Sequence, residues 1–387
     1  MEKKWFEGIK TPCYVIDEER LKKNGELLAD VSRRTGCKIL LAQKAFSNYD
    51  CYPLLRQYLA GTEASGLYEA RLGAEEMPGK EVHVFCGAYR EEEFEELLQY
   101  ADHIVFNSVR QLAKFGHRAK EAGKSIGVRI NPECSTQEGH AIYDPCAPGS
   151  RLGITREVWE TEMTEELLLL LDGLHFHTLC EQDADALEIT LQAVEEKFGD
   201  ILAGMSWLNM GGGHHITKPG YDVEKLEQCI KHAQETWNLQ VYLEPGEAVA
   251  LNAGYLVSRV LDVVTNKETK IAILDASAAC HMPDVIEMPY TPPLYGAEAL
   301  IEGNAFRYRL AGPTCLAGDV IGDYMFPEEL QEGSMLVFED MAIYTTCKNN
   351  TFNGMPLPDI WKRTPEGELV QLTRFGYSDF KERLGSV

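Results

Sequence analysis

The chain has 387 residues, 44% of them hydrophobic and 25% charged, and its formal net charge is -24. This length suits a barrel domain of about 250 residues with a smaller second domain, and the negative charge disfavours binding to nucleic acid while favouring encounter with a cationic ligand. The longest aliphatic run, Leu167 to Leu171, is far shorter than the ~20 residues that cross a bilayer, so no membrane segment is expected.

Cysteine usage and the first residues indicate a compartment. The eleven cysteines are scattered without a Cys-x-x-Cys pair, and an odd number cannot all form disulfides within one chain. We therefore expect thiols. The segment Met1 to Glu7 has no apolar stretch of the kind found in a signal peptide. These features predict a cytoplasmic protein.

Short strand-like runs alternate with amphipathic runs over the first two thirds of the chain, which is typical of parallel βα units. Eight such units close a (β/α)8 TIM-like barrel. Helical spacing of charged and apolar residues is seen in Glu91 to Tyr100, Ser108 to Ala122, Asp183 to Phe198 and Val223 to Trp237. The expected strands are Lys38 to Gln43, Tyr58 to Thr62, Glu81 to Cys86, His103 to Phe106, Ser125 to Ile130, Gly173 to His177, Ser206 to Met210 and Gln240 to Leu243.

From Gly254 onward the chain is strand-rich, with turns of Gly, Pro and Asp, which predicts a C-terminal β-domain. Cys13 to Ile16, which precedes an expected turn at Asp17, would add a strand to it. We expect residues 25–253 to form the barrel and residues 1–24 with 254–387 to form the β-domain. Its expected later strands are Tyr255 to Val264, Lys270 to Leu274, Phe306 to Ala311 and Met335 to Phe338.

Candidate catalytic residues fall at the carboxyl ends of the expected strands, where barrel active sites form. Lys44 follows the first strand, and its amine would suit a Schiff-base nucleophile. Glu63 follows the second strand, His177 ends the sixth and Glu244 ends the eighth. Glu244 could keep a pyridine nitrogen protonated. A surface lysine or carboxylate would look the same in the sequence.

The later strand ends carry a glycine run and several histidines. Gly211, Gly212 and Gly213 could hold a phosphate through backbone N–H groups, or could form an ordinary turn. His175 and His177 lie on one face of their strand, and either could stack on a planar cofactor. The competing idea is a zinc site, although the spacing matches no recognised motif; its ligands would come from His177, Cys180, His214 and His215.

Several segments together resemble the alanine-racemase-fold pyridoxal-phosphate decarboxylases, a family that includes ornithine, arginine and diaminopimelate decarboxylases. The likeness covers nearly the whole chain. The segments around Lys44, Gly211 and Cys315 are most similar to the carboxynorspermidine (carboxyspermidine) branch. The matching segments are Thr11-Pro-Cys-Tyr-Val, Ala42-Gln-Lys-Ala-Phe, Phe176-His-Thr, Gly211-Gly-Gly, Glu244-Pro-Gly, Gly312-Pro-Thr-Cys and Ala342-Ile-Tyr344.

The resemblance implies roles for the matching residues and a homodimer with shared active sites. Lys44 would carry pyridoxal 5'-phosphate as a Schiff base, His177 would stack on its ring, and Glu244 would pair with its pyridine nitrogen. Cys315, in the loop from Gly312 to Asp319, would return a proton to the substrate carbon. The remaining cofactor contacts, mainly to phosphate, would be Gly211, Gly212, Gly213, Gly246 and Tyr344.

Some positions depart from the wider family pattern. Cys180 stands where a phosphate-binding serine is common, and Glu247 stands where an arginine is common. Leu316 replaces the aspartate that follows the cysteine in ornithine decarboxylases, which favours a longer cationic carboxy-polyamine over a short amino acid. No metal is expected. The residues expected to meet the substrate's ammonium groups are Glu287, Asp319 and His281.

Alternatives to this function remain open. One is another decarboxylase of the same fold, acting on diaminopimelate or arginine. A racemase is less favoured, because it would need a second base and a positive group at the ring nitrogen instead of Glu244. A different kind of protein, a silent homologue that binds the cofactor as a regulator, would have no need of both Lys44 and Cys315.

Overall fold

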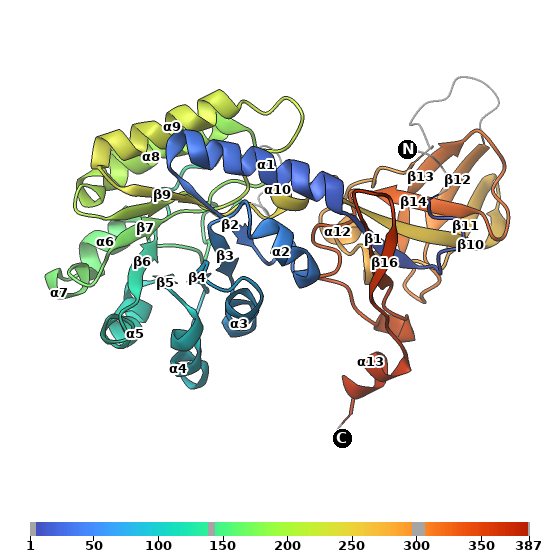
Figure 1. Ribbon diagram of the computed structural model, residues 1–387, viewed down its shortest axis with the longest axis horizontal. Helices are drawn as coiled ribbons and strands as arrows, with labels where there is room; N and C mark the ends of the chain where they lie inside the picture. Colours follow the sequence, from blue (N-terminus) through green and yellow to red (C-terminus); the bar gives the residue numbers. More distant parts are fainter. Residues whose placement is uncertain (1–4, 138–143, 296–305, 386–387) are drawn as a thin grey trace. The chain divides into compact units, whose positions relative to one another are not determined.

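The computed structural model describes residues 5–137, 144–295 and 306–385. The chain divides into two compact units, which are residues 22–249 and residues 1–21 together with 250–387 (Figure 1). Among the described residues, no helix is both long and apolar enough to cross a membrane. All eleven cysteines lie in the described parts and none is in a disulfide, as expected from the sequence.

The first unit is a closed barrel in which each strand pairs in parallel with the next, and β9 pairs with β2. The expected barrel is therefore confirmed. The second strand begins at Gly61 instead of Tyr58, because Tyr58 belongs to the turn after α2. The strands are β2 Lys38–Ala42, β3 Gly61–Ala64, β4 Glu81–Phe85, β5 His103–Phe106, β6 Ser125–Arg129, β7 Gly173–His175, β8 Trp207–Asn209 and β9 Gln240–Leu243.

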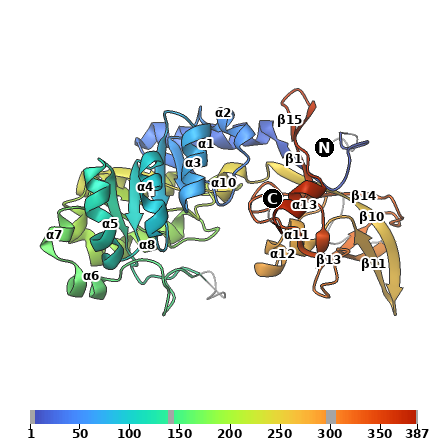
Figure 2. The ribbon, with the colours of Figure 1, turned by 90° about the horizontal axis from the view of Figure 1, so that it is seen from below.

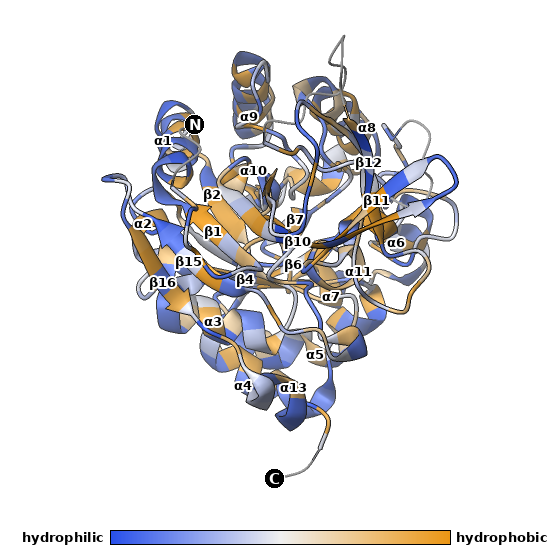
Figure 3. Cartoon of the chain, turned by 90° about the vertical axis from the view of Figure 1, so that its right-hand side faces the viewer, coloured by the Kyte–Doolittle hydropathy of each residue, from blue (hydrophilic) through white to orange (hydrophobic). Residues whose placement is uncertain are grey.

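Helices follow the strands and lie outside them (Figure 2). In α5 the Ser108 side chain caps the first turn by accepting from Gln111 N. Hydrophilic and hydrophobic residues alternate along helices such as α4 (Figure 3), whose inner face is formed by Phe94, Leu97 and Leu98. The helices are α1 Glu18–Thr35, α2 Tyr52–Leu55, α3 Leu67–Glu76, α4 Glu91–Tyr100, α5 Val109–Glu121, α6 Arg156–Glu162, α7 Glu165–Leu168, α8 Ala184–Leu202, α9 Val223–Trp237 and α10 Glu247–Ala250.

The second unit is a mixed sheet in the order β13-β12-β11-β10-β1-β15-β16, with β14 paired to β10. The expected C-terminal β-domain is therefore confirmed. Short helices join these strands: α11 Ala278–His281, α12 Asp284–Glu287 and α13 Tyr377–Glu382. The strands are β1 Cys13–Asp17, β10 Gly254–Asn266, β11 Thr269–Leu274, β12 Phe306–Ala311, β13 Val320–Phe326, β14 Met335–Glu339, β15 Asp359–Arg363 and β16 Leu369–Thr373.

Strand β1 joins this sheet as expected, antiparallel to β10 and parallel to β15. It is fully buried, and Cys13 and Val15 pack in a core cluster with Tyr255. The turn expected at Asp17 is wrong, because α1 begins directly at Glu18. The Asp17 carboxylate accepts a hydrogen bond from Arg20 N at 3.1 Å, which satisfies an N–H of the first helical turn.

Candidate active site

Lys44 lies just beyond β2, beside an acidic residue of the next strand. Its Nζ is 3.8 Å from Glu63 Oε2, and its side chain is 37% exposed whereas that of Glu63 is 2% exposed. The backbone fixes this arrangement, because Gln43 N donates to Glu63 O at 3.1 Å. The amine is thus accessible from the carboxyl ends of the strands, where barrel sites form.

Glu244 follows β9 and is buried inside the barrel. Its Oε1 accepts a hydrogen bond from Asn209 Nδ2 at 2.5 Å, and its Oε2 lies 3.0 Å from His175 Nε2. Burial alone raises the pKa of Glu244, but His175 and the positive charge of Lys44 outweigh burial and hold that pKa below its usual range. The carboxylate is therefore ionised at neutral pH and suited to hold a proton on a ring nitrogen.

His177 lies two residues beyond β7, and its ring is fixed by the glycine run. Gly212 N donates to His177 Nδ1 at 3.1 Å, and Arg129 donates to the His177 carbonyl at 2.8 Å. Burial lowers the pKa of His177, and the nearby cations Lys44 and Arg129 lower it further. A neutral ring that accepts at Nδ1 carries its hydrogen on Nε2. His175 pairs with Glu244 instead, so the two histidines have different surroundings.

The glycine run passes very close to neighbouring backbone. Gly211 and Gly213 have φ values of +68° and +81°, and a Cβ on any of the three would lie within 2.4 Å of a carbonyl oxygen. Gly211 N donates to Asn209 Oδ1 at 2.9 Å, and Gly212 N donates to His177. Two of the three N–H groups are therefore used inside the barrel. Gly246 also serves close packing, since its Cβ would lie 2.6 Å from Ala45 Cβ.

A histidine lies beside the carboxylate that replaces the family's usual arginine. His215 Nε2 is 2.9 Å from Glu247 Oε1, and their side chains are 12% and 17% exposed. Burial lowers the pKa of His215, but the hydrogen bond and charge of Glu247 outweigh burial and raise it. In the sequence, His215 stands out only as a possible zinc ligand. Its pairing with Glu247 places a histidine whose pKa is raised just beyond the glycine run.

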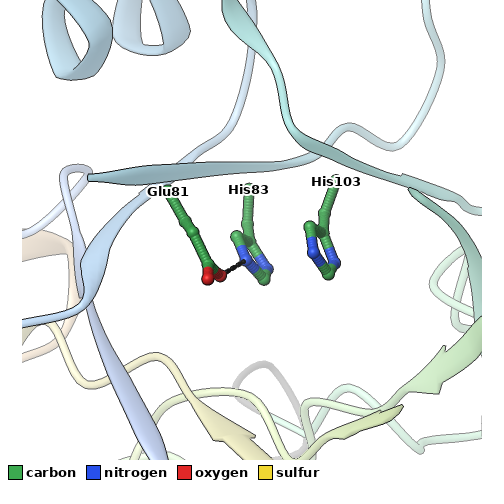
Figure 4. Close-up of side chains that lie close together, drawn as sticks. All are labelled: Glu81, His83 and His103. Atoms are coloured by element: carbon green, nitrogen blue, oxygen red, sulfur yellow. Dashed lines mark hydrogen bonds and ion pairs between the residues drawn. The ribbon is translucent and has the colours of Figure 1, made fainter. Parts of the chain in front are cut away.

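Among the described residues, side chains of the kinds that bind metals gather in two places. Neither place holds the set of zinc ligands considered from the sequence, because His214 bonds to Met210 O and His215 bonds to Glu247. One group is His175, His177 and Glu244; the other is Glu81, His83 and His103 (Figure 4).

The second group lies at the opposite ends of the strands from Lys44. Its rings stack at 3.9 Å with 12° between their planes, and Lys38 already pairs with the Glu81 carboxylate. The face-to-face contact of the two rings and the ion pair of Glu81 with Lys38 are what close packing of the barrel interior produces. This group is a packed layer of the barrel interior.

In the sheet unit, Cys315 is exposed on a loop that Asp319 organises. The buried Asp319 carboxylate accepts from Thr314 Oγ1 at 2.7 Å, from Ser277 Oγ at 2.9 Å and from Ala279 N at 3.2 Å. Cys315 N donates to Asn353 Oδ1 at 3.0 Å. Asp319 therefore shapes the loop, and its expected contact with the substrate stays a prediction.

The other expected substrate contacts differ in exposure. His281 is fully buried, accepts from Ser277 N at Nδ1 and lies 3.1 Å from Pro356 O at Nε2. Its expected contact with the substrate stays a prediction. Burial lowers the pKa of His281 to about 4 and keeps the ring neutral. Glu287, at the end of α12, is 55% exposed and pairs with Lys348. Tyr344 lies beyond β14 at a φ of +53°.

Comparisons with known proteins agree with this arrangement. Residues 13–342 match the family model described as pyridoxal-dependent decarboxylase, C-terminal sheet domain. The chain is 44% identical to a carboxynorspermidine/carboxyspermidine decarboxylase of Campylobacter jejuni, over 98% of this chain and 100% of the relative. It is 40% identical to a carboxyaminopropylagmatine decarboxylase of Synechocystis, over 100% of this chain and 98% of the relative.

The fold comparison points the same way. A crystal structure of carboxynorspermidine decarboxylase from Campylobacter jejuni, complexed with norspermidine, superposes with a TM-score of 0.88 and 43% identity over 97% of this chain and 100% of that one. The match thus covers almost the full length of the chain. It accompanies a lysine at the end of the first barrel strand, an ionised acid at the end of the last strand, and a separate sheet that carries a cysteine loop. The chain belongs to the pyridoxal-dependent decarboxylases.

Proposed function

We propose that the chain decarboxylates carboxynorspermidine and carboxyspermidine to norspermidine and spermidine. The observation that carries this proposal is the match of 44% identity over 98% of the chain to a relative of that name. The site geometry supports it, because Lys44 and an ionised Glu244 share the carboxyl end of one barrel. We also propose a cytoplasmic homodimer, in line with the family resemblance.

The residues present fit pyridoxal 5'-phosphate. An accessible amine, a buried carboxylate held ionised and a fixed neutral imidazole stand at Lys44, Glu244 and His177. The buried His175 Nδ1 and Glu63 Oε2 have no hydrogen-bond partner within the described residues, so the barrel keeps polar groups unsatisfied at this end. When bound, the cofactor supplies an electron sink for the pair left by the departing carboxylate.

Each residue of the barrel would act on that chemistry in its own way. Lys44 Nζ would hold the cofactor covalently and would be displaced by the substrate amine. It would bond to the cofactor again at the end of the turnover. Glu244 would keep the proton on the ring nitrogen, which its ionised state allows. His177 would hold the ring plane in place by stacking. Cys315 Sγ would deliver a proton to the substrate carbon.

We propose that the two units divide this work, with residues 25–253 binding the cofactor and residues 1–24 with 254–387 contributing the Cys315 loop. Hydrogen bonds from Thr314 to Asp319 and from Cys315 to Asn353 give the loop a defined form. In a homodimer the loop of one copy would serve the barrel of the other. The sites would then be shared, as in the family that the chain resembles.

The phosphate would need a cation, and we propose His215 for that role. Its partner Glu247 raises the pKa of the imidazole above the ordinary histidine value, which favours the protonated form. Gly211, Gly212, Gly213, Gly246 and Tyr344 would complete the shell, the glycines chiefly by allowing a close approach of backbone. The positive charge would then come from a histidine instead of an arginine.

The relatives' names describe one kind of substrate. Carboxynorspermidine, carboxyspermidine and carboxyaminopropylagmatine each join a carboxylated aminopropyl group to a second cationic arm. The net charge of -24 favours encounter with such cations. Glu287, exposed and paired with Lys348, would exchange that partner for a distal ammonium. The second candidate substrate is carboxyaminopropylagmatine, favoured by the 40% identity to the Synechocystis enzyme.

A competition assay tests the substrate. The purified holoenzyme would be offered carboxynorspermidine, carboxyspermidine, carboxyaminopropylagmatine, diaminopimelate and arginine, and the products would be measured by mass spectrometry. The highest kcat/KM is expected for carboxynorspermidine or carboxyspermidine. A higher value for diaminopimelate or arginine would overturn the substrate assignment, and the absence of any product would favour a regulatory homologue.

A further inference from the structure

Two buried carboxyl groups lie at the Lys44 end of the barrel, and their surroundings differ sharply. Glu244 has both oxygens engaged, one by Asn209 and one by His175. Glu63 Oε2 is buried without a hydrogen-bond partner among the residues described by the structure. A buried acid left unsatisfied is costly, so its retention calls for a functional explanation.

The electrostatic surroundings of these two acids shift their pKa values in opposite directions. Burial raises the pKa of Glu63, the nearby charges of Glu244 and Glu69 raise it further, and only Lys44 and Arg129 oppose them, so the pKa lies above its usual range. Glu244 is shifted in the opposite direction. Paired acids whose surroundings push their pKa values apart commonly divide the tasks of holding a charge and moving a proton.

Geometry identifies the group with which Glu63 can exchange a proton. Its unsatisfied Oε2 is 3.8 Å from Lys44 Nζ, and the partly exposed lysine side chain has room to close that distance. Glu63 itself is held in place, since Gln43 N and Gln43 Nε2 both donate to its carbonyl, at 3.1 and 3.4 Å. Glu69 is a poor substitute because its Oε2 accepts from Ser65 N at 2.6 Å.

We propose that Glu63 is the proton-transfer partner of Lys44, taking one proton from Nζ before the amine attaches to the cofactor and returning it when the amine is released. The inference rests on the proposed role of Lys44. The first transfer exchanges one N–H bond for one O–H bond and the second transfer reverses it, so protons balance without another reactant. The step matters because only a neutral amine is nucleophilic.

The test follows cofactor attachment and does not depend on turnover. Apoenzyme would be mixed with pyridoxal 5'-phosphate, and the rate of adduct formation at Lys44 would be read from absorbance between about pH 6 and pH 9. Borohydride reduction and peptide mass would locate the adduct. Glu63→Gln should slow attachment about a hundredfold, the low end of the range for positioned acid-base groups, and should lose the part of the wild-type pH profile that the Glu63 carboxyl group contributes.

Matched variants separate proton transfer from packing. Glu63→Asp keeps a carboxyl group but shortens the side chain, whereas Glu63→Gln keeps the shape, so proton transfer predicts that the aspartate variant is faster and packing predicts the reverse. Glu69→Gln removes one charge that raises the pKa of Glu63 but leaves the Glu63 carboxyl group in place, so it should keep attachment close to the wild-type rate and move the Glu63-dependent part of the pH profile to lower pH. Should Glu63→Gln not fold, the rate and pH profile of Glu63→Asp would decide.

Each outcome of these experiments bears either on the role of Glu63 or on the proposed function. A Glu63→Gln rate and pH profile equal to those of the wild type would overturn the inference while leaving the decarboxylase function standing. Attachment that is faster in Glu63→Gln than in Glu63→Asp would also overturn it. If wild-type protein forms no adduct at Lys44, the failure lies in the proposed function and not in the role of Glu63.

Discussion

His215 Nε2 lies 2.9 Å from Glu247 Oε1, in the position where related decarboxylases commonly have an arginine in place of Glu247. In the proposed site, His215 would supply the positive charge that an arginine at the position of Glu247 would otherwise give the phosphate. His215→Asn should therefore weaken pyridoxal 5'-phosphate binding by about tenfold, the effect of about 1.4 kcal/mol. Equilibrium titration of apoenzyme measures this directly.

The same pair predicts a pH dependence. Because Glu247 raises the pKa of His215, the imidazolium should be fully present below pH ~6.5, the ordinary histidine value, and lost as the pH rises through the higher value in the folded protein. Cofactor affinity should fall over that upper interval. An unchanged pH profile in His215→Asn would show that another group supplies the phosphate's cation.

Glu287 provides a prediction about substrate. Glu287→Gln should lower kcat/KM for carboxynorspermidine and carboxyspermidine tenfold to a hundredfold, because a charge-assisted hydrogen bond contributes about 1.5 to 3 kcal/mol. Cofactor binding should be unaffected. Lys348→Met should lower KM for the same substrates, since Lys348 competes for the Glu287 carboxylate. If both variants keep wild-type constants, Glu287 does not meet the substrate.

The Cys315 loop predicts a shared active site. Mixing inactive Lys44→Ala and Cys315→Ala subunits should restore about 25% of wild-type activity, because half of the randomly exchanged dimers would each carry one intact site. Native mass spectrometry would verify that subunits exchange. No recovery in a sample with proven heterodimers would place both residues in the same subunit's site.

The barrel end remote from Lys44 predicts behaviour in acid. Burial alone raises the pKa of Glu81, but hydrogen bonds from His83 and Lys38 outweigh it and lower that pKa to about 2. The stabilisation should be complete above the ordinary value of about 4.5 and lost as the pH falls toward 2. Glu81→Gln should thus destabilise the protein at neutral pH and have little effect near pH 2, as measured by urea unfolding.

The barrel could be predicted from the sequence because most of its strands are short runs rich in apolar residues that alternate with helices, a pattern typical of parallel βα units. Strands β13, β15 and β16 were not expected, since they are half-exposed and carry mixed residues such as those of Asp359–Arg363. Helix α1 was not among the expected helices, because Asp17-Glu-Glu at its start reads equally well as a turn.

The sequence placed Lys44 and Glu244 at strand ends, and the structure has them there, while their catalytic roles stay predictions. The burial of Asp319 and His281 could not be seen in the sequence, because charge and position along a chain do not reveal it, and both have polar atoms engaged inside the sheet unit. The roles inferred for Glu63 and His215 depend on neighbours far away along the chain, Lys44 and Glu247, and so required the fold.

The central claim is that this chain removes carbon dioxide from a carboxylated polyamine with a cofactor held at Lys44. The most direct measurement is release of labelled carbon dioxide from carboxynorspermidine labelled in its carboxyl group, with wild-type and Lys44→Ala holoenzyme preparations side by side. The account predicts label release with equimolar norspermidine from the wild type and none from Lys44→Ala. Release by Lys44→Ala at the wild-type rate, or none by a wild type shown to carry the cofactor, would contradict it.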